Sequence, residues 1–220
     1  MSIEVKNLFK YYGEQAAVRD VSFTVNKGEI VGFLGPNGAG KSTTMKVITG
    51  YINASDGEVK VCGLPVDVDS LDTRRKIGYL PEHNPLYLDM YVKEYLEFVG
   101  QIYKVPNLKE RVKQMIKSVG LDVEQNKKIG ALSKGYRQRV GLAAAIIHDP
   151  EVLILDEPTS GLDPNQLVEI RELIKTIGKS KTVMLSTHIM REVEAICDRV
   201  IIINKGQIVA DDTAAALQLE

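Results

Sequence analysis

Residues 35–42 read GPNGAGKS and fit the pattern G-x-x-x-x-G-K-[S/T], with Gly35, Gly40, Lys41 and Ser42 at the fixed positions. Glycines let backbone N–H groups converge without side chains in the way, which creates a nest for phosphate oxygens. The lysine can reach β- and γ-phosphates, and the hydroxyl that follows it can bind Mg²⁺. The stretch therefore predicts that the chain binds a nucleoside triphosphate.

The flanks of this loop match what a phosphate-binding loop requires. The apolar run EIVGFL (29–34) precedes it, and a helical pattern that ends at Gly50 follows it. The N-terminal end of that helix points its partial positive charge at the same place. A glycine-rich turn that fits by chance is the alternative, and these flanks argue against it. The residues expected to bind the nucleotide are Gly35, Pro36, Asn37, Gly38, Ala39, Gly40, Lys41, Ser42 and Thr43.

Two adjacent carboxylates, Asp156 and Glu157, follow the apolar stretch VLIL (152–155). Consecutive residues of a strand project to opposite sides, so one carboxylate can serve a metal ion while the next faces an attacking water. Two acids after a buried strand are costly without a cation nearby. The alternative is an acidic strand end in a turn, but beside a phosphate-binding loop the pair indicates a Mg²⁺ and hydrolysis site.

A second helix N-terminus is also suited to phosphate. Ser133, in the stretch LSKGYRQR (132–139), is a good N-cap for the helix expected over 134–148. The local pattern supports an ordinary cap and a phosphate site equally. The chain therefore offers two helix ends for phosphate and one complete phosphate-binding loop.

Other motifs narrow the nucleotide chemistry. A GTPase needs Asn-Lys-x-Asp, and the nearest stretch, NKGQ (204–207), has Gln207 in place of the aspartate. No D-x-x-G occurs in the chain either. These two features argue against a GTPase.

Apolar periodicity indicates the elements that must position these residues. Alternation predicts a strand at 21–25, and apolar runs predict buried strands at 29–34, 152–156, 182–188 and 199–204. Helical spacing predicts helices over 92–103, 108–119, 134–148, 164–178 and 189–197.

The order of these elements predicts an α/β fold. It combines a P-loop NTPase core with a mostly parallel sheet, an N-terminal antiparallel β subdomain and an inserted α-helical subdomain. We expect one domain over 1–220. Its parts are the β subdomain (1–30 and 56–64), the core (31–83 and 149–220) and the helical insertion (84–148).

Composition limits the function classes. The 220 residues carry a formal net charge of −1, which favours no nucleic-acid partner. The two cysteines form no C-x-x-C pair, and the three histidines show no metal-ligand spacing. The charges in MSIEVKNLFK argue against a signal peptide, and no run approaches the ~18 uncharged residues of a membrane helix. A soluble, cytoplasmic protein is expected, which leaves attachment to a membrane protein open.

Together these stretches resemble the ATP-binding subunit, or nucleotide-binding domain, of ABC transporters over essentially the whole chain. GPNGAGKST resembles the Walker A motif, VLILDE resembles Walker B, and LSKGY resembles the family signature. The common signature has glycine at Lys134 and glutamine at Tyr136, so no signature glutamine is present. Ser133 and Gly135 are retained, and the resemblance implies that they contact phosphate through the hydroxyl and the backbone.

The resemblance implies roles for three more residues. SGLD (160–163) is similar to the D-loop, with Asp163 at the dimer seam. His188 is similar to the switch histidine, which reaches the γ-phosphate and helps to hold Glu157 and water. Tyr12 matches the aromatic residue that stacks on adenine, with Tyr11 as the substitute. Without the resemblance, His188 would be interpreted as a satisfied strand-end histidine and Tyr12 as a surface tyrosine.

Glu82 stands where the family normally has a glutamine that contacts Mg²⁺ and the water. With glutamate at this position, the chain resembles the ATPase subunits of the ABC-2 exporter type, which also share its LSKG signature. YLPEHNPLYLDMYVKEYL and LSKGYRQRVGLA carry a narrower resemblance, to the gliding-motility-associated ATPase subunit of that group.

The resemblance implies an ATP-hydrolysing motor subunit of a membrane transporter, leaning to export. ATP and Mg²⁺ are its cofactors, with Ser42, Asp156 and Glu82 at the metal, and Lys41, Glu157, His188 and Glu82 in catalysis. Two such subunits, in a homodimer or heterodimer, enclose two ATP molecules head to tail. A separate transmembrane permease holds them on the inner face of the cell membrane, with docking near Glu82. Aromatic residues in NPLYLDMY (84–91) suit such docking or local packing equally.

Two other functions compete with this interpretation. A soluble ABC-type ATPase that remodels a ribosome or DNA complex usually has two ATPase halves or a long coiled coil, and 220 residues hold neither. A non-catalytic module with a relic nucleotide site is disfavoured by the intact Lys41, Asp156, Glu157 and His188.

Overall fold

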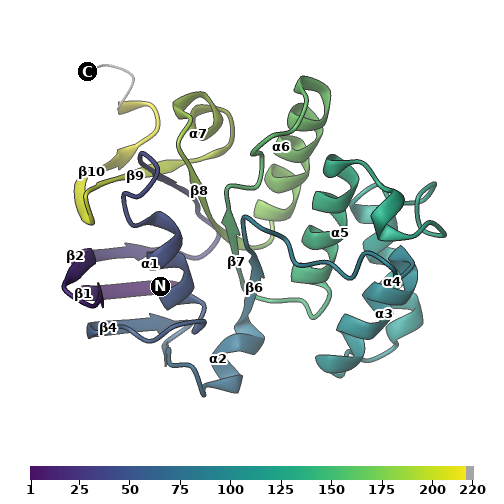
Figure 1. The fold of residues 1–220 in the computed structure, drawn as a ribbon, viewed down its shortest axis with the longest axis horizontal. Coiled ribbons are helices and arrows are strands. Elements are labelled where there is room, and N and C mark those ends of the chain that lie inside the picture. The colour runs from purple at the N-terminus through teal and green to yellow at the C-terminus, as the bar shows by residue number, and fades with distance from the viewer. Residues whose placement is uncertain (217–220) are drawn as a thin grey trace.

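The computed structural model describes residues 1–216, which form two β-sheets with helices packed around them (Figure 1). The four-stranded sheet is antiparallel, in the order β2-β1-β4-β5. Its strands are β1 (Ile3–Tyr12), β2 (Gln15–Val25), β4 (Asp56–Val61) and β5 (Leu64–Pro65).

The six-stranded sheet has the order β10-β9-β3-β8-β7-β6. All neighbouring strands in it are parallel except β9 and β10, which form an antiparallel hairpin. Its strands are β3 (Ile30–Leu34), β6 (Ile77–Leu80), β7 (Val152–Asp156), β8 (Thr182–Thr187), β9 (Arg199–Asn204) and β10 (Gln207–Thr213).

Continuous apolar strands form the middle of this sheet because both of its faces are covered. Every residue of β7 and β8 is buried. Ile154 packs into a core shared with the antiparallel sheet and the helix after β3, whereas Leu153 and Leu155 pack into a second core against other helices. Successive side chains of one strand thus supply two different cores.

The helices are α1 (Lys41–Ile48), α2 (Leu71–Lys76), α3 (Val92–Ile102), α4 (Leu108–Ser118), α5 (Lys134–Ile146), α6 (Pro164–Gly178) and α7 (Met190–Ile196). In Figure 1, α3 and α4 lie beyond α5, on the side of the molecule away from the antiparallel sheet. None of the helices within residues 1–216 has the length and apolar character needed to cross a bilayer.

Several elements differ from the sequence-based expectations; strand β2, for example, begins at Gln15 rather than at 21. Helix α2 and strand β6 were not predicted, and β6 pairs with β7 at the sheet edge. Helix α5 ends at Ile146 rather than at 148. The chain leaves the helix before Pro150 because proline disfavours helical backbone in the preceding residue, and Asp149 has a φ of 57°.

The predicted fold class is confirmed by the two sheets and their arrangement. The finer division into 1–30 with 56–64, 31–83 with 149–220, and 84–148 stays a prediction. The last four residues of the predicted core, 217–220, lie outside the described residues.

His148 lies where the helical region meets the sheet. Its ring stacks on Tyr103 with 3.8 Å between centroids, and Nε2 lies 3.0 Å from the Ile77 carbonyl oxygen. Because a carbonyl only accepts, Nε2 carries the proton, and Nδ1 is buried without a hydrogen-bond partner among residues 1–216. Burial lowers the pKa of His148, and the bond to Ile77 only partly opposes this.

We expect His148 to make the fold less stable at mildly acidic pH. The unfolded chain binds a proton near pH 6.5 whereas the folded chain resists it, so the free energy of unfolding falls as the pH drops below about 6.5. His148→Phe keeps the stack and cannot be protonated. Urea denaturation at pH 7.5 and 5.5 should show a smaller loss for this variant than for the wild type. An equal loss in both proteins would exclude His148 as the cause.

Candidate functional site

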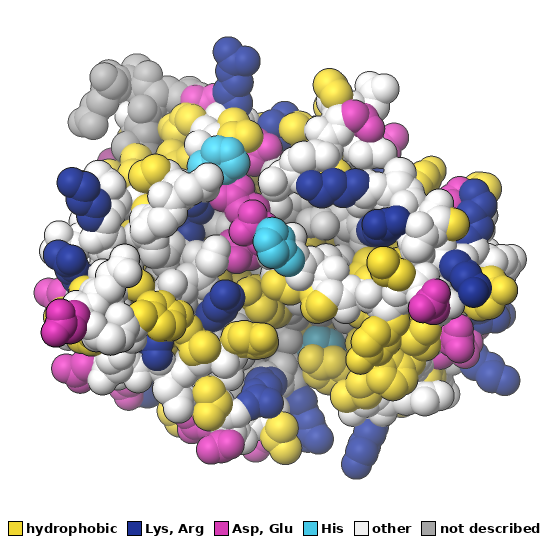
Figure 2. All heavy atoms as spheres, viewed as in Figure 1, with side chains coloured by type: hydrophobic (Ala, Val, Ile, Leu, Met, Phe, Trp, Pro, Cys, Tyr) yellow, Lys and Arg dark blue, Asp and Glu magenta, His cyan; other side chains and the backbone are white. Residues whose placement is uncertain are grey.

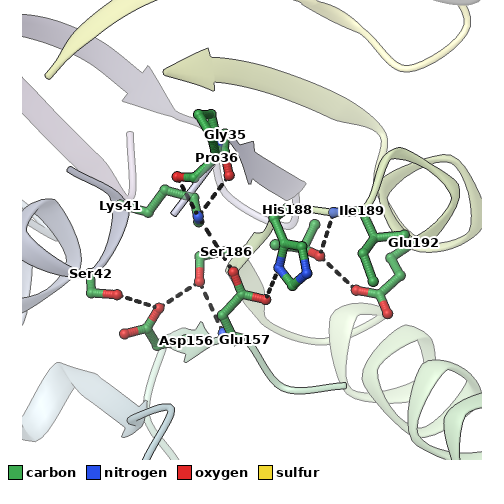
Figure 3. Close-up of polar contacts among 11 residues, drawn as sticks. Gly35, Pro36, Lys41, Ser42, Asp156, Glu157, Ser186, His188, Ile189 and Glu192 are labelled. Carbon is green, nitrogen blue, oxygen red and sulfur yellow. Dashed lines mark hydrogen bonds and ion pairs between the residues drawn. The ribbon is translucent and has the colours of Figure 1, made fainter. Parts of the chain in front are cut away.

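The predicted catalytic residues meet at the carboxyl ends of three adjacent strands. Strands β3, β8 and β7 are neighbours in the sheet, and they end at Leu34, Thr187 and Asp156. In open parallel sheets, ligands bind at this edge. Figure 3 shows Lys41, Asp156, Glu157 and His188 converging there, although 146 residues of chain lie between the first and the last.

Two glycines let the loop after β3 approach its neighbours closely. A Cβ on Gly35 would lie 2.3 Å from the Ile203 carbonyl oxygen. Gly40, at the start of α1, has a φ of 106°, and a Cβ there would lie 2.7 Å from the Ala17 carbonyl oxygen. Larger residues at these two positions would push the loop away from β9 and β2. The two glycines of the motif are therefore a steric requirement here.

Lys41 is only 5% exposed and points back into its own loop. Its Nζ donates to the carbonyls of Gly35 at 2.7 Å and Pro36 at 3.2 Å. It also lies 3.4 Å from Oε1 of Glu157. A buried ammonium needs such acceptors, and the acceptors hold the charge where phosphate oxygens would enter the loop.

Ser186 organises the two carboxylates. Its hydroxyl donates to Oδ1 of Asp156 at 2.6 Å and accepts from the backbone N–H of Glu157 at 2.9 Å. The Ser42 hydroxyl donates to the same Asp156 oxygen at 3.1 Å. The sequence analysis missed Ser186, whose only signal is a small polar residue inside the apolar run TVMLST.

The two carboxylates diverge for a reason other than the predicted one. Strand β7 ends at Asp156, and Glu157 has a φ of 48°, so strand alternation does not continue through it. This left-handed residue turns the chain and sends the Glu157 side chain toward Lys41 and His188. Asp156 and Glu157 therefore have different partners because of a turn rather than strand alternation. Their expected roles at the metal ion and at the attacking water stay predictions.

His188 contacts Glu157 directly. Its Nδ1 lies 3.0 Å from Oε2 of Glu157, and the imidazole is 42% exposed. Because a carboxylate accepts, Nδ1 is the protonated nitrogen, which leaves Nε2 to meet another group. His188 is thus a histidine at a strand end whose partner is the second acid of the site, and its contact with a γ-phosphate stays a prediction.

A cavity of about 630 Å³ lies in front of this cluster. Its wall includes the loop together with Glu82 and Glu157. The sequence analysis missed two basic residues in the same wall, Arg19 of β2 and Lys205 of the β9–β10 turn. Nothing in their local sequence marks them, because only the packing of β2 and β9 against the loop brings them there.

Tyr12 and Tyr11 have different surroundings. Tyr12 ends β1, pairs with Gln15 at the cavity wall, and lies beneath the Lys10 ammonium at 5.5 Å from the ring centroid. Tyr11 stacks on Phe9, with centroids 6.2 Å apart. Tyr11 also pairs with a residue of the cavity wall, Ala16, and neither tyrosine itself lines the cavity that residues 1–216 form. The stacking of Tyr12 on a base therefore stays a prediction.

The second group of predicted residues lies apart from this cavity. The Ser133 hydroxyl accepts from the Tyr136 N–H at 3.3 Å, which confirms the predicted cap of α5. Asp163 caps α6, with Oδ1 accepting from the N–H groups of Asn165 and Gln166 at 3.0 Å each. Aspartate followed by proline at a helix start was a readable signal for that cap.

Gln166 joins the two caps. Its Nε2 donates to the Ser133 hydroxyl at 3.3 Å, and a Cβ on Gly135 would lie 2.6 Å from its Cδ. A side chain at position 135 would therefore displace the Gln166 side chain from Ser133. Neither Ser133, Gly135 nor Asp163 borders the 630 Å³ cavity among the residues that the structure describes.

Comparisons with known proteins agree with this site. The family model described as ABC transporter matches residues 18–160. The chain is 40% identical over 208 residues to the uncharacterized ABC transporter ATP-binding protein YxlF of Bacillus subtilis, covering 94% of this chain and 69% of the relative. It is 36% identical over 218 residues to the Nod factor export ATP-binding protein I of Burkholderia lata, covering 98% of this chain and 72% of the relative.

One similar solved structure contains the products of ATP hydrolysis. The dimeric ATP-binding cassette MJ0796, in a post-hydrolysis state bound to ADP and Pi, superposes with a TM-score of 0.86 at 27% identity. The match covers 96% of this chain and 98% of that one.

Fold and site define a P-loop ATPase of the cassette type. The chain belongs to the ABC transporter ATP-binding proteins, as the motifs implied, and it is the ATP-hydrolysing subunit of such a transporter. The relatives reported above give no support to the narrower gliding-motility resemblance.

We expect Ser186→Ala to destabilise the fold and to slow ATP turnover. The change leaves the buried Glu157 N–H without its acceptor and removes one of the two hydroxyl donors to Asp156 Oδ1, which costs about 1–3 kcal/mol. Urea denaturation and phosphate release measure the two effects. Ser118→Ala, which removes an exposed helix hydroxyl, is the control and should stay within about 0.5 kcal/mol. Equal stability of both variants would contradict the role of Ser186.

Proposed function

We propose that this chain is the motor subunit of an ABC-type exporter. Two copies, or one copy and a related subunit, close around two ATP molecules and drive a separate transmembrane permease from the cytoplasmic face. The observation that carries the proposal is the convergence of Lys41, Asp156, Glu157 and His188 at one sheet edge. In this proposal the regions 1–30 with 56–64, 31–83 with 149–220, and 84–148 form one ATPase domain.

ATP is held through its phosphates. The N–H groups of residues 35–43 and the start of α1 surround the β- and γ-phosphates, and Lys41 neutralises their charge. Arg19 and Lys205 extend the positive wall of the cavity. Tyr12 stacks on the adenine from the end of β1.

The donor set beside the loop fits Mg²⁺. Ser42, Asp156 and Glu82 all offer oxygen, the ligand atom that Mg²⁺ prefers. Ser42 and Asp156 are already within 3.1 Å of each other, and Glu82 lies in the wall of the same cavity as Ser42. When bound, the ion offsets negative charge on the phosphates. Glu82 replaces the usual glutamine, so this site has one more negative charge than is common in the family.

Glu157 and His188 direct the water. The buried Glu157 carboxylate, 7% exposed, accepts a hydrogen bond from the water and orients it for in-line attack on the γ-phosphorus. Lys41 stabilises the charge that develops on the departing phosphate. His188 holds the second oxygen of Glu157 through Nδ1, which leaves Nε2 to contact the γ-phosphate in this proposal.

The second helix end comes from another subunit. Ser133 and Gly135 lie away from the cavity of their own chain, whereas the solved relative is a dimer. In a head-to-tail pair, the start of α5 meets the triphosphate held by the partner's loop. Asp163, which caps α6 and is linked to Ser133 through Gln166, lies at that seam.

A groove connects the site to the proposed permease. A cavity of about 760 Å³ is bordered by Ser42 and Glu82, which also border the nucleotide cavity, and by residues of α3 and α5. In Figure 2, hydrophobic side chains gather on the surface over α3. Tyr87 is exposed yet packs edge-on against Tyr95, with 6.0 Å between centroids, so local packing holds it in a position where a partner can reach it.

We expect Glu157→Gln to abolish ATP turnover while a nucleotide-bound dimer accumulates. The amide keeps the size of the side chain but removes the negative charge that orients the water, whereas the phosphate contacts remain. Phosphate release and size-exclusion chromatography with ATP and Mg²⁺ measure the two effects. Lys41→Ala is the contrasting variant, which should lose ATP binding itself. Undiminished turnover by Glu157→Gln would contradict the role given to Glu157.

We expect Tyr87→Asp to release the subunit from membranes. A charge on the exposed ring position opposes docking of an apolar partner segment, and turnover of the purified protein should stay near the wild-type rate. Mild-detergent pull-down from membranes, with identification of the captured proteins, measures the association. Val123→Asp, at another exposed position of the helical region, is the control. Capture of ribosomes or DNA in place of a multi-span membrane protein would contradict the proposed coupling to a permease.

A further inference from the structure

Glu192 is a buried carboxylate that the mechanism above does not use. It lies in the first turn of α7 and is 2% exposed. Its Oε2 accepts a hydrogen bond from the Thr187 hydroxyl at 2.7 Å, so its side-chain contact is to a hydroxyl rather than to a cation. Burying a carboxylate in this way is costly, which points to a role for the bond that it makes.

Thr187 connects that carboxylate to the loop and to the switch region. Its hydroxyl donates to Glu192 and accepts from the N–H of Ile189 at 3.1 Å. Its carbonyl accepts from the N–H of Gly35, the first residue of the phosphate-binding loop, at 3.2 Å. The backbone N–H of Glu192 in turn donates to the Ile189 carbonyl at 3.1 Å. The turn from 187 to 192 is thus closed by three hydrogen bonds.

His188 lies between the two residues that these bonds hold. Its ring is 42% exposed and its polar contact is with Glu157, so the backbone at Thr187 and Ile189 decides where the ring sits. Figure 3 shows Glu192 reaching back toward the turn beside Ile189 while the His188 ring extends to Glu157.

We propose that Glu192 is a positioning residue for ATP hydrolysis. It fixes the direction of the Thr187 hydroxyl, because a carboxylate only accepts and the hydroxyl must therefore donate to it. The hydroxyl's lone pair is then turned to the Ile189 N–H. This pins the backbone on both sides of His188 and keeps Nδ1 at its 3.0 Å distance from Glu157. The inference rests on the proposed function of Glu157 and His188.

Variants at both ends of the bond test this role. Glu192→Leu and Thr187→Val remove it, whereas Glu192→Gln and Thr187→Ser keep an acceptor and a hydroxyl. We expect kcat to fall by about 10- to 100-fold in the first pair, because small misplacements of catalytic groups are costly, with the KM for ATP changed less than threefold. The conservative pair should stay within about threefold of the wild type. Equal loss in the conservative and apolar variants would overturn the proposal.

The double variant Thr187→Val/Glu192→Leu separates positioning from stability. Replacing both buried partners by apolar groups removes the unpartnered carboxylate, so the melting temperature should recover relative to Glu192→Leu alone. The Ile189 N–H still lacks its acceptor, so kcat should stay low. Recovery of kcat together with the melting temperature would show a merely structural role.

A spectroscopic readout keeps the inference independent of turnover. The ring signals of His188 in ¹H–¹⁵N spectra, assigned by their loss in His188→Ala, should shift or broaden in Glu192→Leu and stay in place in Glu192→Gln. Unchanged ring signals in Glu192→Leu would overturn the proposal even if the wild type hydrolyses ATP. Absence of hydrolysis by the wild type, with the expected ring shifts present, would instead refute the proposed function alone.

Discussion

The buried pair of Lys41 and Glu157 is the interaction on which the rest of the site depends. Both side chains are more than nine-tenths buried, and they come from positions 116 residues apart in the sequence. A lone charge in that position would cost several kcal/mol, so each requires the other or a ligand of matching charge. In the proposed mechanism, the carboxylate that orients the water is therefore paired, before nucleotide binds, with the ammonium that binds phosphate.

The supports of this pair are hydroxyl groups at the end of one strand. Ser186 and Thr187 are consecutive, and because strand side chains alternate they serve opposite sides of β8. Ser186 faces the Asp156 carboxylate and the Glu157 N–H at the end of β7, and Thr187 faces the start of α7. The end of β8 thereby contacts both acids and the backbone around His188. Rigid placement of this kind suits a site that has little covalent chemistry of its own and relies on orientation.

The geometry also supports the proposal that one copy of the chain is an incomplete enzyme. The helix that begins after Ser133 is capped, and it is locked to α6 through Gln166, so it cannot swing into its own cavity without breaking those bonds. Close packing at Gly135 reinforces the link. A second phosphate-binding end held rigidly away from the first is useful only if another subunit brings a nucleotide to it, which is the arrangement proposed here.

The sequence by itself determined the loop 35–43, the acids Asp156 and Glu157, the cap Ser133 and the alternation of buried strands and helices. These features are local: a glycine pattern, an apolar run and a helix start each act over fewer than ten neighbouring residues. The tertiary structure decided the rest. Which strands become neighbours decides the pairing of β6 and the places of Ser186, Arg19 and Lys205 in the site. The periodicity of one strand does not predict its neighbour in the sheet. The turn at Glu157 replaced the expected strand alternation because the strand stops one residue earlier. The place of Glu192 likewise came from packing, since only the fold shows that a carboxylate in a short helix is buried against the hydroxyl that holds His188.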